Sequence, residues 1–310
     1  MRSTAFILLS CALVACGPSG RGDDVGGGGG DGGNGNGDGN GSGSNGDNCS
    51  EASKLVYVVD SNNQLSQFDP TTKLFKDLGV LACPAGSGFT PFSMGVDRNA
   101  TAYVLYVNAD PISGNPIDSK IFKVDTTATG LPCTATSFTP LSTMLEFGMG
   151  FSTSTAGGTT DQLFISGGNT ASTTATSKLA TLDVTTFVTT PVPNGTIQGS
   201  PELTGNANAE LWAFFPDPTN PKIQGINKAT GAAISPAPLP QALKGDPAAW
   251  AFAFYGGDYW IFLAKQAGLS AGPTTVYQVS PTGVLKGMTP TTNRRIVGAG
   301  VSTCAPTVIL

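Results

Sequence analysis

A two-part pattern repeats five times along the chain, and this repetition restricts the fold more than any other feature. The first part is a short apolar strand that runs into a polar turn, and its copies lie about 45–60 residues apart. The Asp, Asn or Ser at the end of each strand can accept hydrogen bonds from the backbone of the turn. Repeats of this length indicate a series of similar, stacked units. The five copies occupy residues 67–72, 123–127, 181–186, 225–231 and 278–283.

The second part is a strand of small residues, and the order of its copies contains an offset. The five copies are residues 93–96, 148–151, 201–204, 251–254 and 297–300. Each of the first four leads into an apolar strand, at residues 103–107, 163–166, 211–215 and 259–263. The fifth has no successor, whereas a matching apolar strand at 54–59 has no predecessor. We therefore expect the last small-residue strand to complete the first unit.

These features predict an all-β fold, a five-bladed β-propeller with overlapped closure, in which the C-terminal strand completes the first blade. Glycine and alanine suit the innermost strands because five blades crowd a narrow axis. Aromatic and β-branched residues suit the second strands, where blades pack on each other. A charged fraction of only 12%, with abundant Thr, Gly and Pro, agrees with β structure and many turns. The alternative interpretation is a β-sandwich with chance internal similarity.

The N-terminus has the pattern of an export signal. Arg2 precedes an apolar run at residues 5–14, which is shorter than the roughly 20 residues of a membrane helix. The run ends in Leu-Val-Ala-Cys at residues 13–16, which resembles the lipobox of bacterial lipoproteins. That resemblance implies removal of residues 1–15 as a signal peptide and acylation of Cys16, for example with palmitate, which would anchor the protein to a membrane. The alternative is an ordinary signal peptide with a chance cysteine.

A linker follows the anchor and precedes the propeller. Residues 16–48 are almost wholly Gly, Asp, Asn and Ser after the first few positions, so they offer nothing to bury and are predicted to be disordered. Position 17 is glycine, not the Asp that retains enterobacterial lipoproteins in the inner membrane. By the same resemblance we expect attachment to the bacterial outer membrane, facing the periplasm or the cell surface. Residues 49–310 are predicted to form the propeller domain.

Four cysteines remain once the signal peptide is removed and Cys16 is acylated. An even number in an oxidising compartment indicates two disulfides, and four cysteines allow three pairings. Cys49 begins the domain and Cys304 ends the closing strand, so we expect a disulfide between them to hold the ring of blades closed. The pairing of Cys83 with Cys133 follows from their places in the outer parts of the first two blades, and partly by elimination.

The composition excludes several kinds of chemistry. The chain has no histidine, so its own residues supply neither Ser-His-Asp nor Cys-His catalysis, nor a His-ligated metal site. The net charge is −5 and no basic stripe is present, so we expect no nucleic-acid partner. We expect no cofactor, with a structural Ca²⁺ held in the channel by carboxylates and carbonyls as the alternative. We expect a monomer.

Six charged or aromatic residues stand at or just before the innermost strands. The segments that enter those strands surround the mouth of a propeller channel, so we expect these side chains to converge there. A ring of acid, base and indole suits a polar ligand such as a glycan, or a protein partner. The two arginines have a plainer interpretation, as ion-pair partners of acids in the same set. The set is Glu146, Glu202, Asp246, Trp250, Arg294 and Arg295.

Carboxylates at this mouth also suggest an enzymatic alternative. Five-bladed glycosidases resemble this layout, and they need carboxyl groups about 5–5.5 Å apart for retention or about 6.5–9.5 Å for inversion. The motifs that surround such pairs in glycosidases are missing. The aromatic cluster at residues 250–260 could stack on sugars, but we expect most of it to pack between blades. We therefore predict a membrane-anchored, non-catalytic binding or scaffold module, with a glycan-active hydrolase as the alternative.

Three segments of the domain resemble a family of uncharacterised lipoproteins of myxobacterial type. Residues 201–205, 250–258 and 297–306 carry the likeness, which extends over most of residues 50–310. The resemblance implies an exported, lipid-anchored protein with a β-propeller domain. It implies no particular activity and no particular site.

Overall fold

The computed structural model describes residues 48–170 and 175–308, which lie in one compact unit, Ser44–Leu310. The predicted signal peptide, Cys16 and nearly all of the linker fall outside the described residues. No helix within the described ranges is long and apolar enough to cross a membrane. Regular structure in these ranges is almost wholly β, with two short 3₁₀ helices, η1 (Ala52–Lys54) and η2 (Gln241–Leu243).

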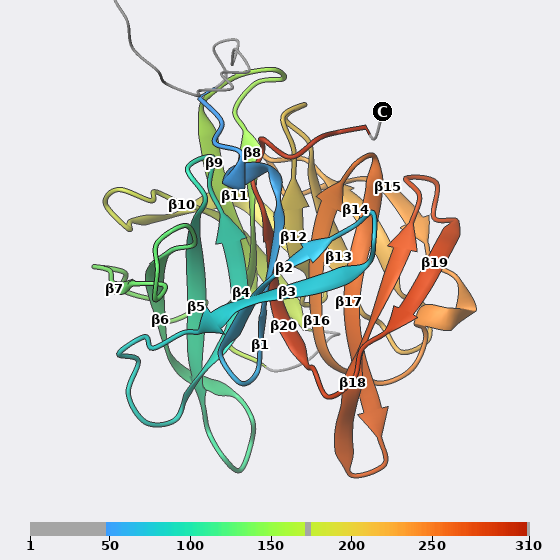
Figure 1. Cartoon of the computed structure of the whole chain (residues 1–310), viewed down its shortest axis with the longest axis horizontal. Helices are drawn as coiled ribbons and strands as arrows, with labels where there is room; N and C mark the ends of the chain where they lie inside the picture. Colours follow the sequence, from blue (N-terminus) through green and yellow to red (C-terminus); the bar gives the residue numbers. More distant parts are fainter. Residues whose placement is uncertain (1–47, 171–174, 309–310) are drawn as a thin grey trace, which may run out of the picture. The chain divides into compact units, whose positions relative to one another are not determined.

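Five antiparallel sheets of four strands each form the blades of a propeller (Figure 1). Blade I consists, from its innermost strand outward, of β20 (Ile296–Val301), β1 (Val56–Asp60), β2 (Gln64–Asp69) and β3 (Leu74–Val80). Blade II consists, in the same order, of β4 (Phe89–Val96), β5 (Thr101–Ala109), β6 (Pro116–Asp125) and β7 (Cys133–Ala135). Blade III consists of β8 (Glu146–Thr153), β9 (Asp161–Gly168), β10 (Thr176–Leu182) and β11 (Thr189–Gln198).

The last two blades continue the same arrangement. Blade IV consists of β12 (Glu202–Gly205), β13 (Leu211–Phe215), β14 (Lys222–Ile226) and β15 (Ala233–Pro238). Blade V consists of β16 (Pro247–Tyr255), β17 (Asp258–Ala267), β18 (Ser270–Val279) and β19 (Leu285–Pro290). Each innermost strand packs against the innermost strands of both neighbouring blades, so the five form a closed ring. The five-bladed β-propeller predicted from the repeats is confirmed.

The ring closes by pairing the two ends of the domain. β20 pairs antiparallel with β1, so the C-terminal strand completes blade I as the offset in the repeats predicted. A disulfide between Cys49 and Cys304 joins the same two ends of the domain. A second disulfide links Cys83, after β3, to Cys133 at the start of β7. Both predicted disulfide pairings are confirmed.

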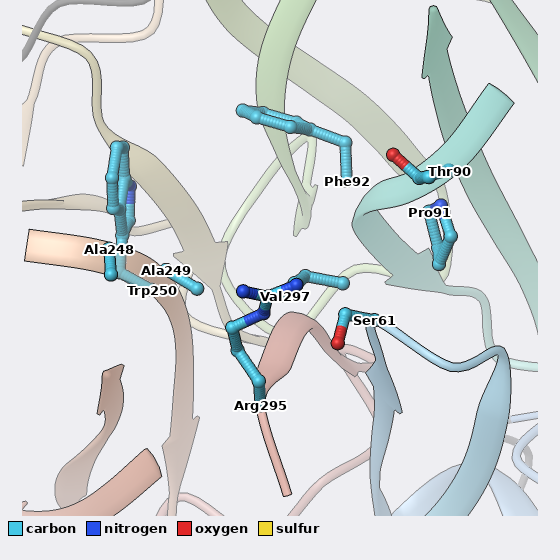
Figure 2. Close-up of a pocket in the computed structure, with 9 residues that line it drawn as sticks. All are labelled: Ser61, Thr90, Pro91, Phe92, Ala248, Ala249, Trp250, Arg295 and Val297. Carbon is cyan, nitrogen blue, oxygen red and sulfur yellow. The ribbon is translucent and has the colours of Figure 1, made fainter. Parts of the chain in front are cut away.

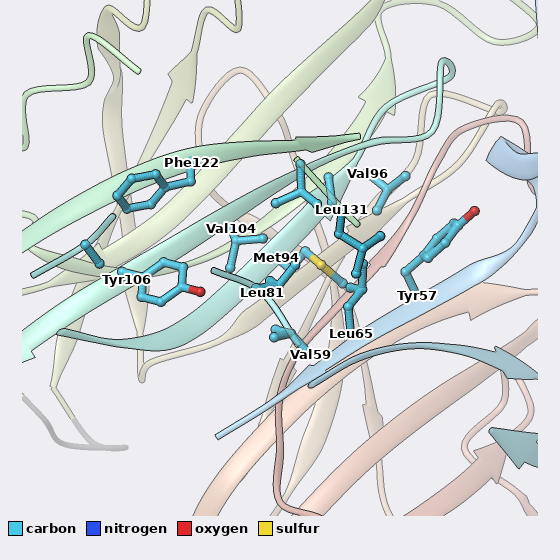
Figure 3. Close-up of a cluster of buried hydrophobic side chains, with 13 residues drawn as sticks. Tyr57, Val59, Leu65, Leu81, Met94, Val96, Val104, Tyr106, Phe122 and Leu131 are labelled. Atoms are coloured by element: carbon cyan, nitrogen blue, oxygen red, sulfur yellow. The ribbon is translucent and has the colours of Figure 1, made fainter. Parts of the chain in front are cut away.

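Hydrophobic side chains fill the layers between neighbouring blades. Between blades I and II, Val59 and Leu65 of blade I share one buried cluster with Met94 and Val104 of blade II (Figure 3). Side chains along a strand alternate between the two faces of its sheet, so each blade contributes to two such layers. The second disulfide packs against this cluster. The core is therefore a ring of interblade layers rather than one central mass.

Most of the aromatic side chains of β16 and β17 pack between blades. Phe252 is buried, and its ring centroid lies 5.9 Å from that of Phe214 in blade IV. Trp260 is buried on the other side of blade V, with its ring 5.3 Å from that of Phe68 in blade I. Trp250 and Tyr255, both on β16, remain partly exposed. This cluster is therefore mainly structural, as expected, and Trp250 is the member that lines a cavity where the chain enters β16.

Neighbouring innermost strands approach so closely that the facing positions require glycine. A Cβ atom at Gly148 of β8 would lie 2.3 Å from the carbonyl oxygen of Pro201 and 2.7 Å from the Cα of Glu202. A Cβ atom at Gly298 of β20 would lie 2.9 Å from the backbone nitrogen of Met94. The small residues of the inner strands are thus explained by backbone-to-backbone contact around the axis.

A largely buried ion pair joins distant parts of the chain where the innermost strands end. Arg98 follows β4, and its guanidinium contacts the carboxylate of Asp161, at the start of β9, at 2.7 and 2.8 Å. The hydroxyl of Thr303, just after β20, donates to the same carboxylate at 2.8 Å. These contacts join blades II and III to the C-terminal segment and add to the closure made by the first disulfide.

Candidate functional site

Two neighbouring cavities lie where the chain enters the innermost strands, and we call this end of the ring the mouth. The mouth pocket has a volume of about 290 Å³ and is lined by the first residues of β4 and β16, with Arg295 and Val297 from the entry to β20. The floor cavity has a volume of about 10 Å³ and is lined by the starts of β8 and β12. Phe92 and Trp250 line both cavities, so the two adjoin each other.

The mouth pocket combines aromatic walls with one cationic side chain. Figure 2 shows the side chain of Arg295 reaching between Trp250 on one side and Ser61 on the other, with Phe92 above it. Trp250 and Phe92 are partly exposed, and Arg295 is exposed. The hydroxyls of Ser61 and Thr90 lie along the remaining wall. Apolar surface with a few placed polar groups is the usual composition of a site for a small molecule.

Two adjacent arginines at this end of the ring have different surroundings. The Nη2 of Arg294 donates to Asp77 at 2.8 Å, its Nη1 donates to Ser66 at 2.7 Å, and its guanidinium lies 5.0 Å from the Phe75 ring. These partners all belong to β2 and β3, so Arg294 is bound to blade I. The side chain of Arg295 forms no hydrogen bond or ion pair with another side chain in the described part of the chain. Arg295 therefore has a guanidinium available to a ligand.

Two carboxylates line the floor cavity. Glu146 begins β8 and is partly buried, whereas Glu202 begins β12 and is only 1% exposed. The Ser93 hydroxyl of β4 donates to Glu202 at 3.0 Å, and because blade III lies between blades II and IV this bond crosses the axis. Burial raises the pKa of Glu146 to about 7. Burial also raises the pKa of Glu202 well above its usual value, and repulsion from Glu146 adds to that shift.

Asp246 lies apart from the other acids. Its side chain is exposed and lines neither cavity, while its backbone carbonyl accepts a hydrogen bond from Gln266 of β17 at 2.9 Å. Within residues 48–170 and 175–308 neither arginine forms an ion pair with Glu146 or Asp246, and Arg294 pairs with Asp77 instead. Four of the six predicted residues gather around the two adjoining cavities, and Asp246 and Arg294 do not: the four are Glu146, Glu202, Trp250 and Arg295.

Several residues of the mouth were not identified from the sequence. Phe92 stands immediately before its small-residue strand, just as Trp250 stands before its own. Alignment of the repeats could therefore have identified Phe92 as a second aromatic residue of the mouth. Thr90 belongs to the same entering segment. Ser61 lies in the turn between β1 and β2, and Ser93 is one of the small residues themselves, so neither had a pattern that would distinguish it.

The raised pKa of the partly buried Glu146 carboxyl predicts a pH-dependent stability. A carboxyl whose pKa is raised by folding, from 4.5 to about 7, favours the folded state only while it is protonated. The free energy of unfolding should therefore fall by about 3 kcal/mol from this group as the pH rises from about 4.5 to 7. Glu146→Gln should flatten this slope in urea unfolding measured across that range in buffer free of divalent cations. An unchanged slope in the variant would contradict the assignment.

No protein-family model and no curated protein sequence matches this chain. Solved structures resemble its fold at low identity. A nidogen/laminin complex structure gives a TM-score of 0.45 at 7% identity, over 82% of this chain and 99% of that one. An exo-β-1,3-galactanase from Phanerochaete chrysosporium gives 0.47 at 11% identity, over 76% of this chain but only 54% of the enzyme chain. TolB from Acinetobacter baumannii gives 0.41 at 11% identity, over 81% of this chain and 67% of that one. These similarities concern the fold alone.

Proposed function

We propose that this chain is an exported, lipid-anchored lipoprotein whose propeller is a non-catalytic binding module for an acidic glycan. The observation that carries the proposal is the mouth pocket, in which an arginine without a side-chain partner and two partly exposed aromatic rings line the same cavity. Its position at the mouth of the ring leaves it open to a ligand from solvent.

The chemistry of the pocket matches a sugar that bears a carboxylate. A guanidinium binds a carboxylate through two parallel charge-assisted hydrogen bonds, which are stronger than neutral ones. Trp250 and Phe92 offer flat apolar faces to the ring of a sugar. The hydroxyls of Ser61 and Thr90 can donate to or accept from sugar hydroxyls. A volume of about 290 Å³ is at the small end for ligand sites, which fits one or two sugar rings of a longer chain.

The floor of the mouth supports binding rather than hydrolysis. Both carboxyl groups of a glycosidase must reach the same glycosidic bond. Glu202 is buried and accepts a hydrogen bond from Ser93, and the cavity it shares with Glu146 has a volume of only about 10 Å³. That volume holds about one water molecule and no sugar ring. The third acid considered, Asp246, lines neither cavity.

Adjacent arginines provide a matched test of this proposal. The full chain would be screened on a glycan array that carries acidic and neutral oligosaccharides, and hits would be measured by calorimetry. Arg295→Gln should weaken binding about tenfold or more, because it removes a charge-assisted hydrogen-bond donor. Arg294→Gln should leave affinity within about twofold, since its contacts are to blade I. Equal effects of the two substitutions, or binding of neutral glycans or proteins only, would contradict the proposal.

The proposed anchor has its own test. The proposal rests on the Leu-Val-Ala-Cys segment at residues 13–16 and the polar linker that follows it. Mass spectrometry of protein extracted from membranes should find a mature chain that begins at Cys16 and carries acyl chains on it. An unmodified Cys16 thiol, or a mature N-terminus at another residue, would contradict the lipoprotein proposal and leave the binding proposal standing.

A further inference from the structure

A buried hydroxyl without a partner lies at the floor cavity. Ser166 of β9 is 1% exposed, and its Oγ forms no hydrogen bond in the structure. Ser166 pairs across the strands with Gly148, and Glu146 lies two residues before Gly148 on the same strand. Because cross-strand partners and alternate residues share a face, the Ser166 and Glu146 side chains both project toward blade IV. An orphaned buried hydroxyl is costly, so it indicates a missing partner.

The two carboxylates at this cavity also lack a countercharge. Neither Glu146 nor Glu202 forms an ion pair with a lysine or arginine among the described residues. Glu202 accepts a hydrogen bond from the Ser93 hydroxyl, and the backbone N–H groups of Met149 and Leu203 nearby also favour its charged form. Burying two like charges side by side is strongly unfavourable unless a cation or a proton compensates them.

We propose that the floor cavity binds one Ca²⁺ ion through the carboxylates of Glu146 and Glu202 and the hydroxyl of Ser166. Every candidate ligand atom is an oxygen, and Ca²⁺ takes six to eight oxygen ligands, chiefly from carboxylates that bind through one or both oxygens, carbonyls and waters. The carbonyl of Pro201 is also present in the cavity wall, at the position where Gly148 lacks a side chain. Among the described residues, no three or more His, Cys, Asp or Glu side chains are close enough together to hold a metal ion. The hydroxyl and carbonyl oxygens are therefore needed to complete the coordination of the calcium ion.

The size of the cavity selects among cations. A volume of about 10 Å³ accommodates a single atom-sized guest. Mg²⁺ usually keeps several of its waters, and these would not fit. A dehydrated Ca²⁺ with ligands at about 2.3–2.6 Å would fit. Phe92 and Trp250 line both this cavity and the mouth pocket, so an ion can enter through the mouth. The site does not depend on the proposed glycan binding.

The test is the thermal stability of the purified full chain with and without Ca²⁺ at pH 7.5. The chain would be stripped with a chelator, and CaCl₂ would be compared with MgCl₂ and with NaCl of equal ionic strength. Calcium at about 100 times its Kd should raise Tm by about 5 °C or more, and chelator should reverse the rise. Calorimetry should give one calcium ion per chain. Absence of a rise, or an equal rise with Mg²⁺, would overturn the proposal and indicate a buried water or proton instead.

Variants separate this site from non-specific binding of calcium to surface acids. Glu202→Gln and Glu146→Gln should each abolish the calcium-induced rise in Tm, and Ser166→Ala should reduce calcium affinity several-fold. Asp246→Asn, which changes an exposed acid outside the cavity, should keep the full response. If Glu202→Gln does not fold, Glu146→Gln and Ser166→Ala still decide the result. A full calcium response in both of these variants would overturn the proposal.

Discussion

Replacement of Cys49 and Cys304 by serine is expected to lower the free energy of unfolding by about 5 kcal/mol. The disulfide closes a loop with a sequence separation of 255 residues, and in the loop-entropy model it restricts nearly the whole unfolded domain. The pairing of β20 with β1, the hydrogen bond from Ser302 to Ser53 and the contacts around Thr303 would then hold the two ends of the ring together. Urea unfolding of the oxidised parent and of the double variant, monitored by tryptophan fluorescence, measures the difference.

The second disulfide provides the comparison for this experiment. Cys83 and Cys133 are separated by 50 residues, for which the same model gives about 4 kcal/mol. Both double variants should remain folded at room temperature, with the Cys49/Cys304 variant the less stable of the two. A loss below about 2 kcal/mol for that variant would contradict the view that the disulfide is a main element of ring closure.

Gly148→Ala is expected to destabilise the domain by about 3 kcal/mol or more. The added Cβ would lie 2.3 Å from the carbonyl oxygen of Pro201 and 2.7 Å from the Cα of Glu202, and backbone atoms of a neighbouring blade cannot move aside cheaply. Replacing glycine by alanine also restricts the unfolded chain, but that gain is only about 0.4–1 kcal/mol. Thermal and urea unfolding of the variant would measure the net cost.

Gly95 of β4 is the matched control for this substitution. It also lies on an innermost strand, but the three atoms nearest to a Cβ there belong to the side chains of Leu163 and Phe151, at 3.3 and 3.4 Å. Side-chain ends can shift by a few tenths of an ångström, so Gly95→Ala should change stability by less than about 1 kcal/mol. Equal effects of Gly95→Ala and Gly148→Ala would contradict the close approach of blades III and IV.

The fold was predictable because the repeats carry both the strand pattern and its order. Small residues identify the strands that crowd the axis, and the unpaired first and last strands identify the closure. The pairing of Cys304, after the last strand, with Cys49, before the first, then follows from that closure. Each of these inferences depends on periodicity along the chain, which sequence shows directly.

The site was predictable only in part, because it depends on distances across the ring. Adjacent Arg294 and Arg295 have the same residue type, and sequence does not show which one blade I binds. The hydrogen bond from Ser93 to Glu202 joins residues 109 positions apart, and it requires the axis to be narrow enough for two side chains to meet. Phe92 was within reach of sequence reasoning, since it matches Trp250 in the repeat.

The three tryptophans of the chain allow one measurement to test the mouth as the binding site. Trp260 is buried and its indole nitrogen donates to the Tyr255 carbonyl at 3.2 Å, while Trp212 stacks on Phe254 at 4.7 Å. Only Trp250 lines the mouth pocket. Each indole N–H gives its own signal in a ¹H–¹⁵N NMR spectrum, so the three sites report separately on an added ligand.

The tightest-binding acidic glycan from the array would be titrated into the ¹⁵N-labelled chain. The signal of Trp250 should shift until it saturates, and the Kd fitted to this shift should equal the Kd found by calorimetry. The signals of Trp212 and Trp260 should stay in place. The same titration of the Arg295→Gln variant should need about tenfold more glycan. Saturable binding that leaves the Trp250 signal unmoved, or failure of every acidic glycan to bind, would contradict the account.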